Sequence, residues 1–266
     1  MVEILKAAIL GLVEGVTEFL PISSTGHLIV ASSLLGFQGS VGGTFEIFIQ
    51  LGAVLAVVWF YRRDLWWQAQ RLPKDRSVQR LWLNVAIAFA PAAVLGLLLH
   101  RWIKAVLFSP EVVALALVIG GIVLILVERH DHAGGTARLT DISPRQALVV
   151  GIAQVLSLVP GTSRSAASIV GGLLGGLDRP TATAFSFYLA IPTLGLATLF
   201  DLATSLDQIN RQDALLLAVG LAVAFISALA AVGWLLRYVA THDFRPFGIY
   251  RILAGVAVLA WFWALH

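Results

Sequence analysis

Gly11-Leu-Val-Glu14-Gly-Val-Thr-Glu18-Phe-Leu-Pro21-Ile-Ser23-Ser24-Thr25-Gly26-His27 is the stretch that decides the fold of this chain. A near-copy, about 139 residues later, reads Gly151-Ile-Ala-Gln154-Val-Leu-Ser157-Leu-Val-Pro160-Gly161-Thr162-Ser163-Arg164-Ser165. Pro21 aligns with Pro160 and Ser24 with Ser163. The residues before the prolines need an offset of 140, which predicts one residue gained or lost at the turn. Both copies place ionisable or hydroxyl side chains in apolar sequence, where they are costly and indicate function.

The composition around these motifs is that of a membrane protein. Of the 266 residues, 59% are hydrophobic and 12% are charged, and the mean hydropathy is +0.89. Such values indicate a polytopic membrane protein. The chain has no cysteine, which excludes disulfides and thiolate sites. Its net charge is only +3 and no basic stripe with interleaved aromatics occurs, so we expect no nucleic-acid binding.

Apolar stretches divide into two lengths. Six can cross a bilayer, at about 45–62, 82–100, 111–128, 183–201, 214–237 and 246–265. Four are short, at 4–20, 27–37, 147–159 and 166–177, and each pair flanks one motif. Two half-length helices around a Pro/Ser/Gly turn predict a re-entrant hairpin, which must be shielded by protein or line a cavity.

The predicted fold is a single all-α polytopic membrane domain over residues 1–266. It contains an inverted-topology repeat, with repeat 1 at about 1–128 and repeat 2 at about 145–266. Each half is a hairpin followed by three spans, which makes six full spans and four half-helices. Three spans are an odd number, so the halves insert in opposite directions and their site lies near the midplane. Phe45 and Phe185 begin the span after each hairpin.

Basic residues predict the orientation. The predicted loops near 62–80, 129–145 and 237–245 carry eleven arginines and lysines on one face. The other face carries four, which are Lys6, Arg101, Lys104 and Arg211. The side richer in basic residues is expected to be cytoplasmic, so both termini lie outside. The first hairpin then enters from outside and the second from the cytoplasm.

Glu14 and Glu18 are candidates for acid–base work or metal binding. Their i, i+4 spacing puts them on one helix face, about 6 Å apart along the axis. Two carboxylates this close in a low dielectric repel each other. Either one stays protonated or a cation holds both ionised. The structural alternative is a pair satisfied by neighbouring hydroxyls.

The residues that follow suit an anion. Pro21 is expected to end the first half-helix, and Ser23, Ser24 or Thr25 to cap the second. A helix N-terminus with free N–H groups also binds anions. His27 lies in the first turn of that half-helix. It is either a packing residue or, as we favour, a group for acid–base chemistry or phosphate contact.

The second motif supplies Arg164, predicted to be the single deep arginine. Guanidinium matches phosphate oxygens in bidentate fashion. Gly161 allows close backbone approach, and three hydroxyls, Thr162, Ser163 and Ser165, surround the arginine. The alternative, an ion pair of Arg164 with Glu14 or Glu18, is compatible because such a pair can open to admit an anion. The set favours a phosphate carried by an amphiphile that enters sideways from the lipid.

The chain resembles the bacterial undecaprenyl-diphosphatases, also called bacitracin-resistance proteins, over essentially its whole length. The motifs that carry the resemblance are Glu14 to His27, Pro160 to Ser165, and Phe45-Glu-Ile-Phe-Ile-Gln-Leu-Gly52. It departs from the family pattern mildly, with Ser168 where some relatives have threonine and Ala166 where glycine is common.

This resemblance implies hydrolysis of undecaprenyl diphosphate to undecaprenyl phosphate and inorganic phosphate, which recycles the lipid carrier of peptidoglycan synthesis. It implies a multi-pass protein of the bacterial plasma (inner) membrane with its site open to the outer, periplasmic side. A divalent cation, Mg²⁺ or Ca²⁺ with low specificity, would bind at Glu14 and Glu18. The catalytic residues implied are Glu14, Glu18, Ser24, His27 and Arg164. Those expected to bind substrate are Ser23, Thr25, Gly161, Thr162, Ser163, Ser165 and Ser168.

Three questions stay open from the sequence. Ser24 is the favoured nucleophile, activated by a carboxylate or by His27, but direct attack by water gives the same products. A transporter or flippase of a polyprenyl phosphate is the alternative function, because inverted repeats with midplane hairpins are typical of carriers. Membrane lipid surrounds the chain in either case, and the oligomeric state, a homodimer included, is left open.

Overall fold

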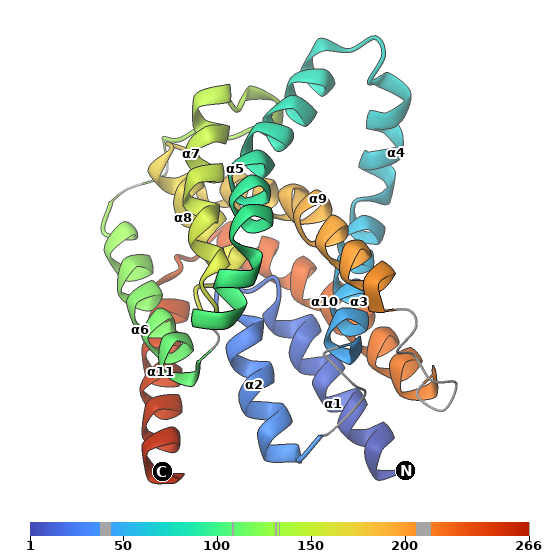
Figure 1. The fold of residues 1–266 in the computed structure, drawn as a ribbon. Helices are drawn as coiled ribbons and strands as arrows, with labels where there is room; N and C mark the ends of the chain where they lie inside the picture. The colour runs from blue at the N-terminus through green and yellow to red at the C-terminus, as the bar shows by residue number, and fades with distance from the viewer. Residues whose placement is uncertain (38–43, 108, 131, 133, 206–213, 266) are drawn as a thin grey trace.

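A computed structural model describes residues 1–37, 44–107, 109–130, 132, 134–205 and 214–265. These residues form α-helices joined by short turns (Figure 1). The helices are α1 (Val2–Thr17), α2 (Ser24–Leu35), α3 (Thr44–Phe60), α4 (Arg62–Arg71), α5 (Arg76–Val106), α6 (Pro110–Val127), α7 (Pro144–Val155), α8 (Arg164–Leu174), α9 (Arg179–Ser205), α10 (Ala214–Val239) and α11 (Arg245–Leu265). The predicted all-α class is confirmed.

In the part of the chain that the structure describes, five helices are long and apolar enough to cross a membrane, namely α5, α6, α9, α10 and α11. A sixth span is obtained if α3 and α4, which meet at an angle of 66°, count as one. The prediction of a loop near 62–80 is wrong. Residues 62–71 form α4, and α5 begins at Arg76. Asp75 accepts a hydrogen bond from the Ser77 N–H and caps α5, so the turn is short. Arg211 lies outside the described residues.

Two helical hairpins, α1–α2 and α7–α8, occupy the four short apolar stretches. Figure 1 shows both chain termini at one end of the molecule, and α1–α2 rises from that end. The α7–α8 hairpin comes from the opposite end, and the two tips meet in the middle. The Ser165 hydroxyl donates a 2.8 Å hydrogen bond to the Leu20 carbonyl, which joins the two tips directly.

The backbone corrects the alignment of the two motifs. Ser23 and Ser163 precede the second half-helix of their hairpins, with φ of 73° and 71°, a conformation rare for residues other than glycine. Gly36 and Gly176, which follow those half-helices, also have positive φ. Both pairs keep the offset of 140, so Ser23, rather than Ser24, corresponds to Ser163 and no residue is inserted. Pro21 was expected to end the first half-helix. α1 ends four residues earlier, at Thr17, and the turn begins there.

Each hairpin packs against a long helix from the other half of the chain. A Cβ at Gly11 of α1 would collide with the Gly220 carbonyl of α10, and one at Gly151 of α7 would collide with Ala88 of α5. Glycine at these two positions therefore permits close backbone contact, as is common between membrane helices. The contacts hold both hairpins in the interior.

The outer surface is apolar, as expected of a chain surrounded by lipid. Leu97, Leu253 and Trp263 are 76%, 65% and 79% exposed. The buried polar side chains of the hairpins include Glu14, Glu18, Ser23, Ser24, Ser165 and Ser168. Polar groups thus gather in the interior, around the hairpin tips.

Candidate active site at the hairpin tips

Glu18 is the centre of the cluster, because both of its carboxylate oxygens accept hydrogen bonds. The Ser24 hydroxyl donates to one oxygen over 2.6 Å. Arg164 Nη2 donates to the other over 3.1 Å and forms a buried ion pair with it. The structure thus brings together a residue from each hairpin on one carboxylate. The ion pair that the sequence left as the alternative for Arg164, with Glu14 or Glu18, is present with Glu18.

Glu14 lies one helical turn before Glu18. Glu18 keeps helical dihedrals beyond the end of α1, and its N–H donates to the Glu14 carbonyl over 2.9 Å. The Glu14 side chain is 1% exposed. The two glutamates therefore share one face of the helix, as their spacing predicts.

Arg164 is oriented by α9 as well as by Glu18. Nη1 donates to the carbonyl and the hydroxyl of Ser186 over 3.1 and 3.2 Å, and the guanidinium lies 5.6 Å from the ring centroid of Phe19. Among the described residues, no acceptor contacts the buried Arg164 Nε. A buried donor without an acceptor costs about 1–3 kcal/mol, so it marks a place where an oxygen from a ligand would be stabilising.

The hydroxyls of the second hairpin mostly hold its structure. Ser163 accepts a hydrogen bond from the Ala166 N–H and caps α8, whereas Ser23 caps α2 through its backbone position alone. The Ser168 hydroxyl donates to the Arg164 carbonyl and lies 2.7 Å from the Ser186 hydroxyl. These contacts fix the first turn of α8, from which the Arg164 side chain extends.

His27 is placed apart from this network. Its Nδ1 lies 2.7 Å from the Ser23 carbonyl oxygen and its Nε2 lies 2.6 Å from the Tyr250 hydroxyl. Of the two activating groups left open for Ser24, the carboxylate is therefore the one in contact. Thr25 and Thr162 are half-buried beside the turns.

Arg251 of α11 is a second deep arginine, so the prediction that Arg164 is the only one is wrong. It is fully buried, and it donates to the main-chain carbonyls of Pro21 and Gly161 in the two turns, and to those of Ala116 and Leu117 in α6. The φ of Gly161 is 92°, and a Cβ there would collide with Val113, so this turn needs glycine. Arg251 holds the two hairpin tips together.

Sequence reasoning also missed Tyr250 and Ser186. A positive charge inside the predicted span 246–265 was the available signal for Arg251. For Tyr250 and Ser186 no signal was available, because an aromatic or a serine in an apolar helix is ordinary.

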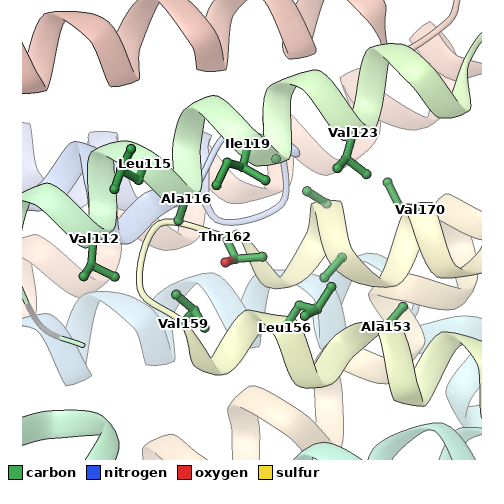
Figure 2. A pocket seen from close by; sticks show the side chains of 13 residues that line it. Val112, Leu115, Ala116, Ile119, Val123, Ala153, Leu156, Val159, Thr162 and Val170 are labelled. Atoms are coloured by element: carbon green, nitrogen blue, oxygen red, sulfur yellow. The ribbon is translucent and has the colours of Figure 1, made fainter. Parts of the chain in front are cut away.

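Two apolar grooves flank the hairpin tips. One of about 350 Å³ lies between α6 and α7–α8, and Figure 2 shows its lining, with Thr162 as a hydroxyl among aliphatic side chains. The other, about 380 Å³, lies between α1–α2 and α11. We call these the α6 groove and the α11 groove. His27 and Tyr250 line the α11 groove together with Val30, Ala257 and Trp261.

The acid pair has limited capacity for a metal ion. Within the described ranges, no group of three or more histidine, cysteine or acidic side chains gathers. Mg²⁺ typically binds through one or two carboxylates together with substrate phosphates and water. Glu14 and Glu18 fit a cation that is shared with a phosphate ligand, and they do not fit a cage made of protein alone.

These helices and this buried cluster define a multi-pass membrane protein with an ionisable site between two hairpin tips. The sequence profile described as bacitracin resistance protein BacA matches residues 7–257. A protein of Methylobacillus flagellatus named undecaprenyl-diphosphatase is 51% identical over 265 residues, which cover 98% of each chain. Proteins of the same name from Laribacter hongkongensis and Dechloromonas aromatica are 49% and 51% identical, over 97% of this chain and 94% of theirs. The chain belongs to the bacitracin resistance protein BacA family.

Proposed function

We propose that this protein is an undecaprenyl-diphosphatase, which hydrolyses undecaprenyl diphosphate to undecaprenyl phosphate and inorganic phosphate. The observation that carries the proposal is the buried Ser24–Glu18–Arg164 network, in which a hydroxyl and a guanidinium meet on one carboxylate. The identity of about 50% to undecaprenyl-diphosphatases over nearly the whole chain supports it.

The reaction begins with the Ser24 hydroxyl. Its proton passes to Glu18, its oxygen attacks the terminal phosphorus, and the bond to the bridging oxygen breaks, so that undecaprenyl phosphate leaves. Water then attacks the phosphoserine and loses a proton, the P–Oγ bond breaks, and Glu18 returns its proton to Ser24. When Glu18 accepts the proton, its ion pair with Arg164 weakens. The guanidinium, with its free Nε, then stabilises charge on the phosphoryl oxygens.

A divalent cation, Mg²⁺ or Ca²⁺, belongs to this proposal. Glu14 and Glu18 would hold it together with the diphosphate, and it would supply positive charge against the growing negative charge of the leaving group. We predict that removing divalent cations from the purified protein with a chelator lowers phosphate release by at least tenfold, and that adding Mg²⁺ restores it. Full activity in excess chelator would contradict a role for the cation.

The prenyl chain of the substrate lies in the α11 groove. The lining of this groove is mostly aliphatic, with His27 and Tyr250 next to each other as polar groups, which matches an amphiphile with its phosphate at one end. We expect Ala257→Phe, which fills this groove, to raise the KM for undecaprenyl diphosphate and to leave the KM for a five-carbon prenyl diphosphate unchanged. Val123→Phe in the α6 groove is the control. The opposite pattern would assign the chain to the α6 groove.

The whole fold is proposed to be an inverted-topology repeat of six spans and four half-helices in the bacterial plasma membrane. The offset of 140 between Ser23 and Ser163 supports it, as does the packing of each hairpin on a helix of the other half. The excess of basic residues in the loops of one face supports a site that opens to the outer, periplasmic side.

Phosphate release from purified protein in detergent tests the function. A flippase needs a membrane to act across, so release of phosphate in detergent distinguishes the enzyme from the transporter. We expect Arg164→Lys to lower kcat by about 10²–10³-fold, because the ammonium cannot reproduce the forked contacts. Arg129→Lys, at an exposed arginine, is the matched control. No phosphate from folded wild-type protein would overturn the proposal.

The covalent step has its own test. Substrate labelled in the terminal phosphate should leave label on the protein after rapid acid quenching, and Ser24→Ala should abolish this label. Ser33→Ala, an exposed serine on the same helix, should retain it. Unlabelled wild-type protein at full turnover would show that water attacks directly.

A further inference from the structure

Tyr250 of α11 makes two contacts with His27, from a position 223 residues away in the chain. Its hydroxyl lies 2.6 Å from Nε2. The two rings are stacked, with centroids 5.5 Å apart and planes within 7° of parallel. One contact fixes a nitrogen of the imidazole and the other fixes the plane of the ring, so Tyr250 restrains His27 in both respects.

The other nitrogen of His27 determines which tautomer is held. Nδ1 lies 2.7 Å from the Ser23 carbonyl oxygen, and a carbonyl oxygen can only accept a hydrogen bond. Nδ1 therefore carries a proton. In the neutral ring, Nε2 then has a lone pair, and the Tyr250 hydroxyl donates to it.

This arrangement is built from strained backbone. Ser23, whose carbonyl holds Nδ1, has φ of 73°. Residues in such conformations are strained and persist where the surroundings over-determine them. Arg251, the neighbour of Tyr250, donates to the Pro21 carbonyl in the same turn. α11 therefore contacts the first hairpin at two points. Arg251 binds the turn, and Tyr250 binds His27.

We propose that Tyr250 is a positioning residue of the hydrolysis, which holds the ring plane and the Nε2 edge of His27 at the head of the α11 groove. The Ser23 carbonyl keeps the proton on Nδ1 and so leaves Nε2 as the proton-accepting nitrogen. The proposal rests on the proposed function, because it gives His27 a part in the same reaction. Ser24 already has Glu18 as its acceptor. Once the Tyr250 hydroxyl turns its proton away, His27 Nε2 can accept a proton in the second half of the reaction, where a water molecule must lose one as it attacks.

The tautomer is observable without any enzyme activity. In nitrogen-15 spectra of histidine-labelled protein, one histidine should show a protonated Nδ1 and an unprotonated Nε2, and this signal should disappear in His27→Gln. Tyr250→Phe keeps the ring and removes the hydroxyl, so we expect the signal of the unprotonated His27 Nε2 to shift as its hydrogen bond is lost, while Nδ1 stays protonated against the Ser23 carbonyl. Tyr238→Phe is the matched control, because Tyr238 also stacks on a histidine, His242, with centroids 4.6 Å apart.

Kinetics supply the second readout. We expect Tyr250→Phe to lower kcat by about tenfold, a part of the 10²–10⁴-fold that a general base contributes, with KM changed less than twofold. A purely structural role would instead lower the melting temperature and leave the Nε2 signal of His27 and kcat unchanged.

The outcomes separate the two proposals. An Nε2–H tautomer in the wild type, or a Tyr250→Phe protein with the wild-type spectrum and kcat, would overturn the positioning role. This holds even if Tyr250→Phe fails to fold, since the wild-type spectrum alone tests the tautomer. Failure of the proposed function would give a different result, because the wild-type protein would then release no phosphate.

Discussion

At the residue scale, Glu18 receives hydrogen bonds from two side chains that occupy the same place in the two hairpins. Ser24 follows Ser23 and Arg164 follows Ser163, and each is the first residue of its half-helix. The two hairpins therefore present different chemistry from one geometric position, a hydroxyl from the first and a guanidinium from the second. One composite site results.

Replacing each glutamate by glutamine should separate their roles. Glu18→Gln leaves the buried Arg164 without a counter-charge and should cost about 3–5 kcal/mol of stability, together with activity. Glu14→Gln should be far less destabilising, because Gln154 holds the equivalent position in the second hairpin, fully buried. Thermal unfolding in detergent measures both. Equal losses of stability would contradict the central place of Glu18.

Arg251 should be required for assembly of the two tips. Arg251→Met removes the donors for four main-chain carbonyls, and each buried carbonyl left unpaired costs roughly 1–3 kcal/mol. We expect a large drop in melting temperature, whereas Arg129→Met, at an exposed site, should cause almost none. An unchanged melting temperature for Arg251→Met would show that the two turns keep their conformation without the hydrogen bonds from Arg251.

At the scale of elements, the short helices were predictable and their contacts were not. The apolar spacing and the Pro/Ser/Gly turns are local signals, so the four half-helices appear where the sequence places them. The α4 helix was missed because its charged sequence reads as a loop, although it continues from α3 after a bend of 66°. The true register of the two motifs became clear only from the matched φ of Ser23 and Ser163.

Close packing of the first hairpin should depend on Gly11. Gly11→Val would force α1 away from the Gly220 carbonyl of α10 and cost about 1–3 kcal/mol, the usual range for overpacking. Gly134→Ala adds a methyl where nothing lies within 4 Å and serves as the control. Equal melting temperatures for the two variants would show that α1 does not need this close approach.

At the scale of the whole molecule, buried ionic contacts tie the ends of several helices together. Glu128, at the end of α6, accepts a bidentate hydrogen bond from Arg179 of α9 and another from the Phe244 N–H before α11. This network lies away from the hairpin tips and ties together helices that pack around them. Positioning of the site is therefore a property of the assembled bundle.

The proposed orientation can be tested directly because the chain has no cysteine. A maleimide that does not cross membranes should label Glu3→Cys in cells whose outer membrane has been opened, since the proposed orientation puts the N-terminus outside. It should label Gly134→Cys, in the basic loop, only after the inner membrane is permeabilised. The reverse pattern would invert the topology and place the site on the cytoplasmic side.

The sequence by itself determined the membrane class, the two hairpins, and the glutamates, serine and arginine of the site. Hydropathy and short turn motifs are local and need no knowledge of distant contacts. Only the tertiary structure decided that Glu18 is shared by Ser24 and Arg164, that His27 faces Tyr250, and that Arg251 clamps both turns. The partners that come from different hairpins or helices are 90 to 230 residues apart in the chain. Their pairing depends on how the helices pack. In the interior of a lipid-embedded protein a buried charge has no water to bind, so it must find a partner in another helix.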